Sequence, residues 1–210
     1  MEKKMNKILI GLIFLVQISA NDAYANSLEG KFKFDIKAPQ VSLVYFDDDN
    51  ILNNSALSMD QKNKEFTKKM IVGSRKSSIT FKNSDNVEHN IYGSLKGKVL
   101  FDIGLTSPGS KHTKHIDWDK GNVAKLSCKI HPKMNAWVAS VDTKHFSIVE
   151  FNNKREKSFA INNIPDKLTK VKIWFPNISE QIIEIKKNEV KQVVLKKGDK
   201  SIGTLELSLK

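Results

Sequence analysis

Short runs in which apolar and polar residues alternate follow one another along most of the chain. A period of two is typical of β-strands, because successive side chains of a strand point to opposite faces of a sheet. Clusters of turn-forming residues such as NSDN, SPGS, DKGN and NNIPD separate the runs, and no amphipathic helix or long internal repeat is evident. The pattern predicts a β-sandwich or barrel, or two of them in series. The strands are expected at 30–36, 41–46, 76–81, 88–93, 98–103, 122–128, 136–141, 145–151, 171–175, 181–185, 190–195 and 203–209.

The N-terminus has the pattern of an export signal. Three lysines precede the apolar run ILIGLIFLV (8–16), and AYA (23–25) places small residues where a signal peptidase cleaves. The alternative is a retained anchor helix, but the run is shorter than a membrane span needs, and polar residues follow it at once. We therefore expect residues 1–25 to be a signal peptide cleaved after Ala25, and a mature protein without a membrane anchor in the periplasm or outside the cell.

The charge of the chain bears on its partners. The chain has 35 Lys and Arg against 23 Asp and Glu, a formal charge of +12. Such a balance favours acidic partners, although the lysines are scattered and most of them are expected to solvate the surface. Nucleic acid is not expected as a partner, because the chain is predicted to be exported and has no recognition motif.

The single cysteine, Cys128, is unusual in an exported protein, where cysteines generally pair as disulfides. Alternation in NVAKLSC (122–128) places it on the same face as Ala124 and Leu126, so the thiol should point into the core. It is either an inert buried thiol or a metal ligand. In an oxidising compartment, metal binding explains an unpaired thiol better.

The residues near Cys128 favour metal binding. CKIHPKM (128–134) places Cys128, His131 and Met134 in one loop between two predicted strands, and His89 in DNVEHNIYG is the best candidate for a further ligand. Taken singly, the histidine and the methionine are more often ordinary core or surface residues. Together, two imidazoles, a thiolate and a weak thioether form the ligand set of a blue-copper centre. Zinc would favour more thiolates or a carboxylate.

The Cys-x-x-His-Pro-x-Met spacing of 128–134 resembles the ligand loop of amicyanin-like cupredoxins, and 66–93 resembles the cupredoxin strand pair that ends in His-Asn. The resemblance covers about 60–142 and implies a Greek-key cupredoxin β-sandwich with one type 1 copper. It implies His89, Cys128 and His131 as equatorial ligands and Met134 as the axial one.

A closer resemblance is to cupredoxin-containing proteins known as methylamine utilization proteins. Their copper segment is followed by a carboxypeptidase regulatory-like or transthyretin-like sandwich, which 157–176 resembles. The chain departs from their pattern at Asn90, which replaces a second histidine, and at Lys157 and Phe175. We therefore expect a second small Ig/transthyretin-like β-sandwich at 143–210, N-terminal strands at 26–56 that pair with it, and a cupredoxin domain at 57–142.

Further residues receive roles from the same resemblance. Asn90 is expected to tie its strand to the cysteine loop, although Lys129 stands where a hydroxyl-bearing residue is usual. Pro132, with Lys129 and Lys133 beside it, is expected to form a docking surface for an acidic redox protein. The other histidines, which are expected at the surface, are His112, His115 and His145.

The functional prediction is an exported blue copper protein that carries single electrons between redox partners. Two alternatives remain: a periplasmic copper-binding or chaperone protein, and a binding module with a structural metal site. An enzyme is not expected, because four protein ligands leave no open metal position for a substrate.

Overall fold

The computed structural model describes residues 26–48 and 56–210, and all regular structure in these ranges is β-strand. The predicted signal peptide, 1–25, lies outside the described residues. The prediction of an all-β protein built from sandwiches is confirmed. No helix within the described ranges is long and apolar enough to cross a membrane.

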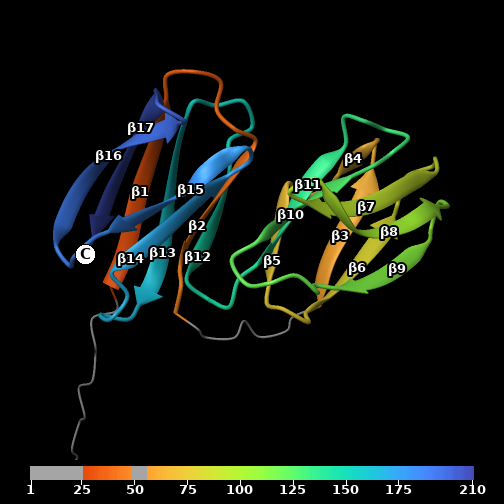
Figure 1. Ribbon diagram of the computed structural model, residues 1–210, viewed down its shortest axis with the longest axis horizontal. Helices are drawn as coiled ribbons and strands as arrows, with labels where there is room; N and C mark the ends of the chain where they lie inside the picture. The colour runs from red at the N-terminus through yellow and green to blue at the C-terminus, as the bar shows by residue number, and fades with distance from the viewer. Residues whose placement is uncertain (1–25, 49–55) are drawn as a thin grey trace, which may run out of the picture.

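The ends of the described chain form one sandwich, here named the terminal sandwich (Figure 1). One sheet has the order β13-β1-β17-β16, with the bounds β13 Glu156–Ile164, β1 Asn26–Phe34, β17 Lys200–Leu209 and β16 Glu189–Lys197. The facing sheet has the order β12-β2-β14-β15, with the bounds β12 Phe146–Glu150, β2 Val41–Phe46, β14 Lys170–Phe175 and β15 Ile178–Glu184.

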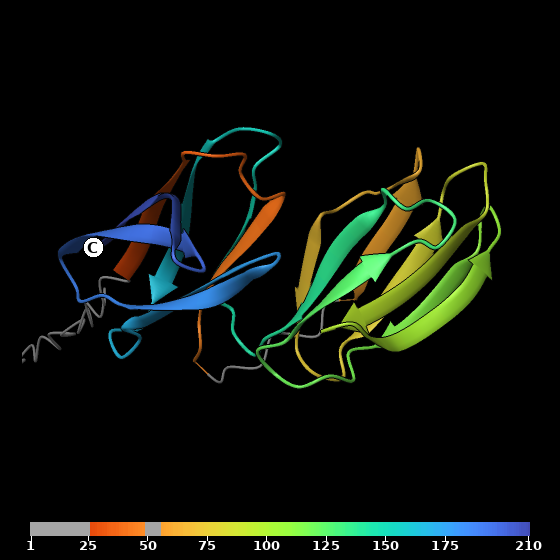
Figure 2. The same cartoon turned by 45° about the horizontal axis from the view of Figure 1, so that its top comes forward.

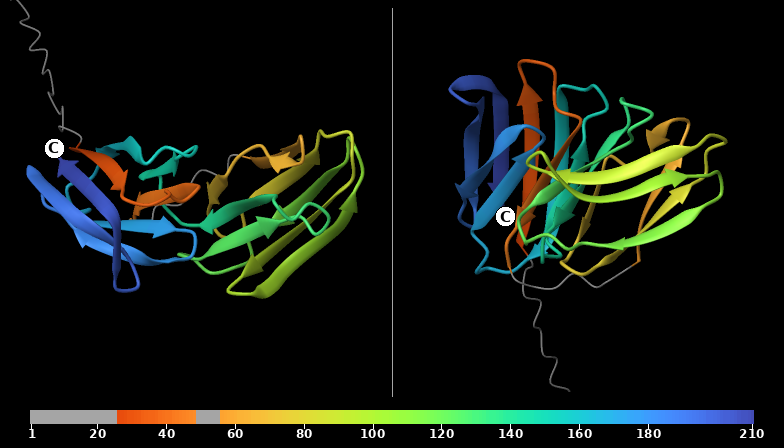
Figure 3. Two further views of the ribbon diagram at one scale, coloured as in Figure 1. Left: turned by 90° about the horizontal axis from the view of Figure 1, so that it is seen from above. Right: turned by 45° about the vertical axis from the view of Figure 1, so that its right-hand side comes forward.

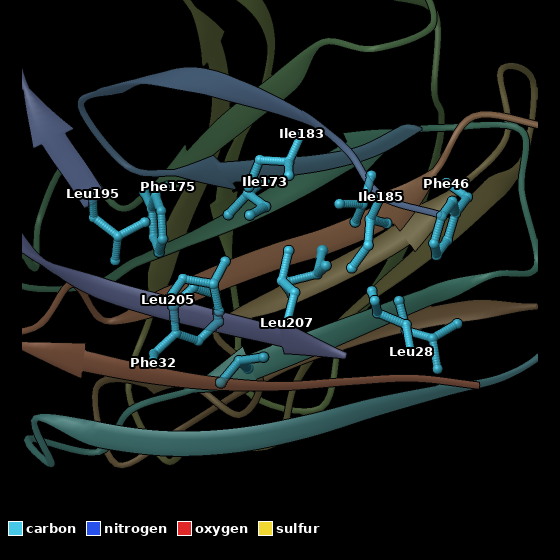
Figure 4. Packing of buried hydrophobic residues seen from close by; sticks show 14 of the residues in the cluster. Leu28, Phe32, Phe46, Ile173, Phe175, Ile183, Ile185, Leu195, Leu205 and Leu207 are labelled. Atoms are coloured by element: carbon cyan, nitrogen blue, oxygen red, sulfur yellow. The ribbon is translucent and has the colours of Figure 1, made fainter. Parts of the chain in front are cut away.

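Alternation along the strands fills the core of the terminal sandwich. In β1, Leu28 and Phe32 are buried while Lys31 and Lys33 are exposed. Phe32 packs edge to face on Phe175, with 5.6 Å between ring centroids, and Figure 4 shows these side chains between the two sheets. Both N-terminal strands are central, since β1 lies between β13 and β17 and β2 lies between β12 and β14. The C-terminal strands therefore depend on the N-terminal ones to close their core.

Strands β3 to β11 form the other sandwich, here named the inserted sandwich (Figure 2). Its five-stranded sheet has the order β5-β11-β10-β7-β8, with the bounds β5 Met70–Gly73, β11 Asn135–Ser140, β10 Val123–Ser127, β7 His89–Leu95 and β8 Lys98–Thr106. Its four-stranded sheet has the order β4-β3-β6-β9, with the bounds β4 Glu65–Phe66, β3 Leu57–Lys62, β6 Ser78–Asn83 and β9 Lys111–His115.

An apolar cluster joins the two sandwiches, which lie side by side in the left-hand view of Figure 3. Outward-facing residues of β2 pack on outward-facing residues of β5 and β11, and Trp137 meets Trp174 edge to face with 6.1 Å between ring centroids. Beside this cluster, Asp47 binds Lys172 of the terminal sandwich at 2.8 Å and also pairs with Lys120 of the inserted sandwich. These outer faces are apolar and would be unfavourable in contact with water. Each sandwich therefore covers the apolar outer face of the other.

Candidate metal centre

Cys128 follows β10 directly and is 3% exposed. It lies in the same core cluster as Ala124 and Leu126, which confirms the predicted inward orientation. The backbone N–H of Asn90 donates a hydrogen bond to the Cys128 sulfur at 3.3 Å. This bond ties the sulfur to the start of β7 and so holds it in a fixed position.

His131 and Met134 are placed by the turn that follows Cys128. The backbone N–H of Met134 donates to the carbonyl of His131 at 2.9 Å, which closes the loop. Met134 is 2% exposed and shares the core cluster of Cys128, whereas His131 is only half-buried. The loop therefore places a methionine in the core and an imidazole at the boundary with solvent.

His89 comes from a different strand, as the first residue of β7, and is fully buried. It pairs with Thr106 of β8, whose hydroxyl donates to the His89 carbonyl at 3.1 Å. Strand β7 also pairs with β10, the strand that leads to Cys128. Sheet register thus brings together two residues that are 39 positions apart.

The donor atoms of His89, Cys128 and His131 all lie within 4.8 Å of one another. The two Nδ1 atoms are 3.0 Å apart, and the sulfur is 3.6 Å from Nδ1 of His131 and 4.0 Å from Nδ1 of His89. Two imidazole nitrogens that share an ion at ~2.0 Å with near-tetrahedral angles lie roughly 3.3 Å apart. The three side chains therefore have the spacing and the chemistry of ligands to one metal ion.

Asp85 supports His89 from behind, a contact that sequence reasoning missed. Its Oδ2 lies 3.0 Å from Nε2 of His89 and accepts the backbone N–H of Lys64 at 2.7 Å. This backbone bond from Lys64 is the main cause that holds the Asp85 pKa below its ordinary value. A carboxylate on Nε2 orients the ring so that Nδ1 faces the metal position. The signal in the sequence was an aspartate four residues before the histidine, in SDNVEH.

The side chain of Asn90 contacts Asp102 of β8, while its backbone N–H bonds to the Cys128 sulfur. Its side-chain amide donates to Asp102 Oδ1 at 2.9 Å, and Lys129 of the loop pairs with the other oxygen of Asp102. The Lys129 bond, followed by bonds from the Gly104 N–H and from Asn90, lowers the Asp102 pKa to about 2. Asn90 is thus connected to the loop directly through its backbone N–H and also through Asp102 and Lys129, the residue that stands where a hydroxyl-bearing one is usual. We name Asn90, Asp102 and Lys129 the loop clasp.

Among the comparisons with known proteins, only the one with solved structures found similar proteins. No protein-family model matches the chain, and no curated protein matches it. Solved structures of cupredoxins resemble part of it. A purple cupredoxin from Nitrosopumilus maritimus has 21% identity and a TM-score of 0.36, over 40% of this chain and 98% of that one.

Two further structures are similar to about the same extent. An amicyanin from Paracoccus versutus has 11% identity and a TM-score of 0.36, over 46% of this chain and 96% of that one. A copper-containing nitrite reductase from Thermus scotoductus has 14% identity and a TM-score of 0.38, over 44% of this chain and only 24% of that one.

A hollow of about 350 Å³ opens beside His131, lined by Ile130, Pro132, Lys64 and Lys133 among others. Burial, followed by the neighbouring His89 and Lys64, lowers the His131 pKa below its ordinary value. A neutral imidazole keeps its lone pair available for a metal. Of the lysines expected at a docking surface, Lys133 is exposed at this hollow, whereas the charge of Lys129 is paired with Asp102.

The remaining histidines lie away from this cluster. His112 is half-buried and His115 exposed on β9, where their odd spacing directs them to opposite faces, as expected. His145 was expected at the surface, and this is wrong: it is 2% exposed and its Nε2 lies 3.3 Å from Asp48. The reason is its place in the segment that returns from β11 to β12, next to the end of β2.

Proposed function

We propose that this chain is an exported type 1 copper protein that carries single electrons between redox partners. The observation that carries the proposal is the convergence of Nδ1 of His89, Nδ1 of His131 and the sulfur of Cys128 within 4.8 Å. Two imidazoles and a thiolate suit copper in both of its oxidation states. Met134 would be the weak axial ligand, and residues 57–142 would form the copper domain.

Copper, when bound, supplies reversible one-electron chemistry; the protein supplies a fixed set of donors. His89 and Cys128 are buried, the Cys128 sulfur accepts an N–H from Asn90, and His89 is held by Asp85. Groups fixed in this way need little rearrangement when the charge at the centre changes, and small rearrangement favours fast electron transfer. All four proposed ligands come from the protein, which supports a carrier rather than an enzyme.

The electron would leave through the half-buried His131. The hollow beside it has an apolar part, Ile130 and Pro132, and a cationic rim, Lys64 and Lys133. Such a surface suits brief docking to an acidic redox protein, because rim charges raise the encounter rate more than they tighten the complex. Lys129 would contribute less, because Asp102 pairs with it. The proposed compartment is the periplasm or the exterior of the cell.

The test is the colour of the purified protein with Cu(II). A thiolate bound to copper should produce an intense visible band that disappears on reduction and returns on oxidation. Cys128→Ser should lose the band and keep the far-UV circular dichroism of a β protein, because serine fills nearly the same space. Zn²⁺ serves as the colourless control ion.

Three outcomes would contradict the proposal. Retention of the band in Cys128→Ser would place copper elsewhere. Copper bound only in the reduced state, without colour on oxidation, would indicate a copper chaperone. Stable binding of Zn²⁺ with no affinity for copper would indicate a structural metal site.

A further inference from the structure

A groove follows the boundary between the terminal and inserted sandwiches. It consists of two hollows of about 520 Å³ and about 340 Å³. Both are lined by Lys125, Trp137, Pro176 and Asn177, so they adjoin one another. We name them together the seam groove. Ligand sites occur preferentially at such boundaries between structural units.

The lining of the seam groove includes two tryptophans and two exposed lysines. Trp137 and Trp174, in edge-to-face contact at 6.1 Å, come from different sandwiches and both border the larger hollow. Lys96 and Lys125 line the same hollow and are exposed, and neither forms an ion pair with any residue in the described ranges. The acidic residue of the same hollow, Glu180, accepts a hydrogen bond from the Tyr45 hydroxyl at 2.8 Å. The hydroxyl does not cancel the carboxylate charge, so the lining of the larger hollow has two lysines against one glutamate and a net positive charge.

Two side-chain amides are available for hydrogen bonding. Gln40, in the β1–β2 loop, and Asn177, in the β14–β15 turn, line the smaller hollow and are exposed. Neither side chain is hydrogen-bonded to another residue within 26–48 and 56–210. An amide offers both a donor and an acceptor, as the backbone of an extended chain requires of its binding site.

The seam groove begins at the proposed metal loop. Asn135, which lines the smaller hollow, directly follows Met134, and its side-chain amide donates to the carbonyl of Lys133 at 2.9 Å. The opposite wall, including Pro39 and Pro176, belongs to the terminal sandwich. The groove therefore exists only because the second sandwich lies against the first, and it leads to the metal loop.

We propose that the seam groove binds an extended acidic polypeptide segment of the redox partner. Lys96 and Lys125 would pair with carboxylates, the tryptophans would contact apolar side chains, and Gln40 and Asn177 would bind backbone groups. A segment held here would keep the partner beside the metal loop between encounters and so raise its effective concentration there. The identity of the partner rests on the proposed electron-carrier function, but the binding of the segment requires no metal.

The experiment uses the full-length, metal-free protein and a blocked peptide of glutamates interrupted by leucines. Binding is measured by calorimetry and by tryptophan fluorescence, at low and high ionic strength. The variant Lys96→Glu/Lys125→Glu should bind the peptide about 10-fold more weakly, since it replaces attraction with repulsion. The matched control is Lys111→Glu/Lys114→Glu on β9, with the same change in net charge, which should weaken binding less than about 2-fold.

Several results would overturn the inference. One is no binding of the peptide at low ionic strength. Another is equal weakening by both charge reversals, which would indicate attraction to the net charge alone. A third is equally tight binding of a polyglutamate without leucines or of an acidic polysaccharide, which would exclude selection for an apolar polypeptide. None of these results alters the visible band with Cu(II), so failure of this inference is distinguishable from failure of the proposed function.

Discussion

At the scale of single residues, the geometry of the candidate metal centre depends on groups that are not themselves proposed ligands. His89 is fully buried, and its two ring nitrogens have separate tasks. Nδ1 faces the sulfur and the second imidazole, while Nε2 faces Asp85 at 3.0 Å. Because Lys64 also bonds to Asp85, the carboxylate is itself held in place. The orientation of His89 thus rests on the β3–β4 turn as well as on its own strand.

Asp85→Ala should lower the affinity for copper by about 10- to 100-fold, the usual effect of removing a group that orients a metal-binding histidine. Asp85→Asn should have a smaller effect, since its amide oxygen can still accept from Nε2. The measurement is competition with a copper chelator of known affinity, with circular dichroism as the check on folding. Equal affinities in all three proteins would show that Asp85 does not position His89.

At the scale of elements, the loop clasp joins β7, β8 and the loop that carries Cys128 and His131. Asp102 accepts bonds from Asn90, which is 5% exposed, and from Lys129, whose side chain is 58% exposed. An exposed ion pair by itself contributes little to stability. The buried amide matters more, because it would lose its partner if Asp102 were removed.

Asp102→Ala should therefore destabilise the protein by about 1–2 kcal/mol, since a buried donor is left without an acceptor. It should also hasten the loss of copper, because the loop that carries Cys128 and His131 loses its tie to β8. Lys129→Ala should cost less, because Asn90 keeps its bond. The matched control is Asp117→Ala, an exposed carboxylate outside the clasp. Urea unfolding of the metal-free proteins measures the difference, and a cost no greater than that of Asp117→Ala would contradict the role of the clasp.

The clasp also predicts a dependence on pH. The folded pKa of Asp102 is about 2, below the ordinary value of 3.8, so its contribution to stability is present above about pH 4. It should be lost as the pH falls from about 4 to about 2, because protonation removes the charge that Lys129 and Asn90 bind. Unfolding of the metal-free wild type should lose stability over this range more steeply than that of Asp102→Asn. Parallel curves would contradict the assignment.

At the scale of the whole molecule, the two ends of the chain depend on each other. Strand β1 lies between β13 and β17, and β2 lies between β12 and β14, so each sheet of the terminal sandwich has an N-terminal strand inside it. The core beneath them combines Leu28, Phe32 and Phe46 with C-terminal residues such as Phe175 and Leu205. Removal of the N-terminal strands would open both sheets and expose this core.

The fragment 143–210 should therefore not fold alone. Joining 26–48 directly to 143–210 restores every strand of both sheets and should recover a β circular dichroism spectrum with cooperative unfolding. That chain should be less soluble than the full-length protein, because the apolar face around Leu43 and Trp174 loses its cover. Cooperative unfolding of 143–210 by itself would contradict the arrangement.

The sequence alone determined those features that depend on residues close together in the chain. Alternation with a period of two predicted the strands, because neighbouring side chains of a strand face opposite ways whatever the fold. The spacing of Cys128, His131 and Met134 placed them in one loop, because residues so close in sequence stay near each other in a short turn. His89 was a candidate ligand from its place in DNVEHNIYG, and the family resemblance added to that choice, but its nearness to Cys128 depends on the pairing of β7 with β10.

Features that depend on which strands become neighbours could not be read from the sequence. The bond from Lys64 to Asp85, the bond from Asn90 to Asp102, the burial of His145 and the seam groove all join segments whose proximity is set by sheet register or by the contact between sandwiches. Periodicity tells which face of a strand is apolar, but not which apolar face it meets, because hydrophobic attraction has no direction. The outer face of β2 reads as an ordinary buried strand in sequence, and only its contact with β11 makes it one wall of a boundary between two sandwiches.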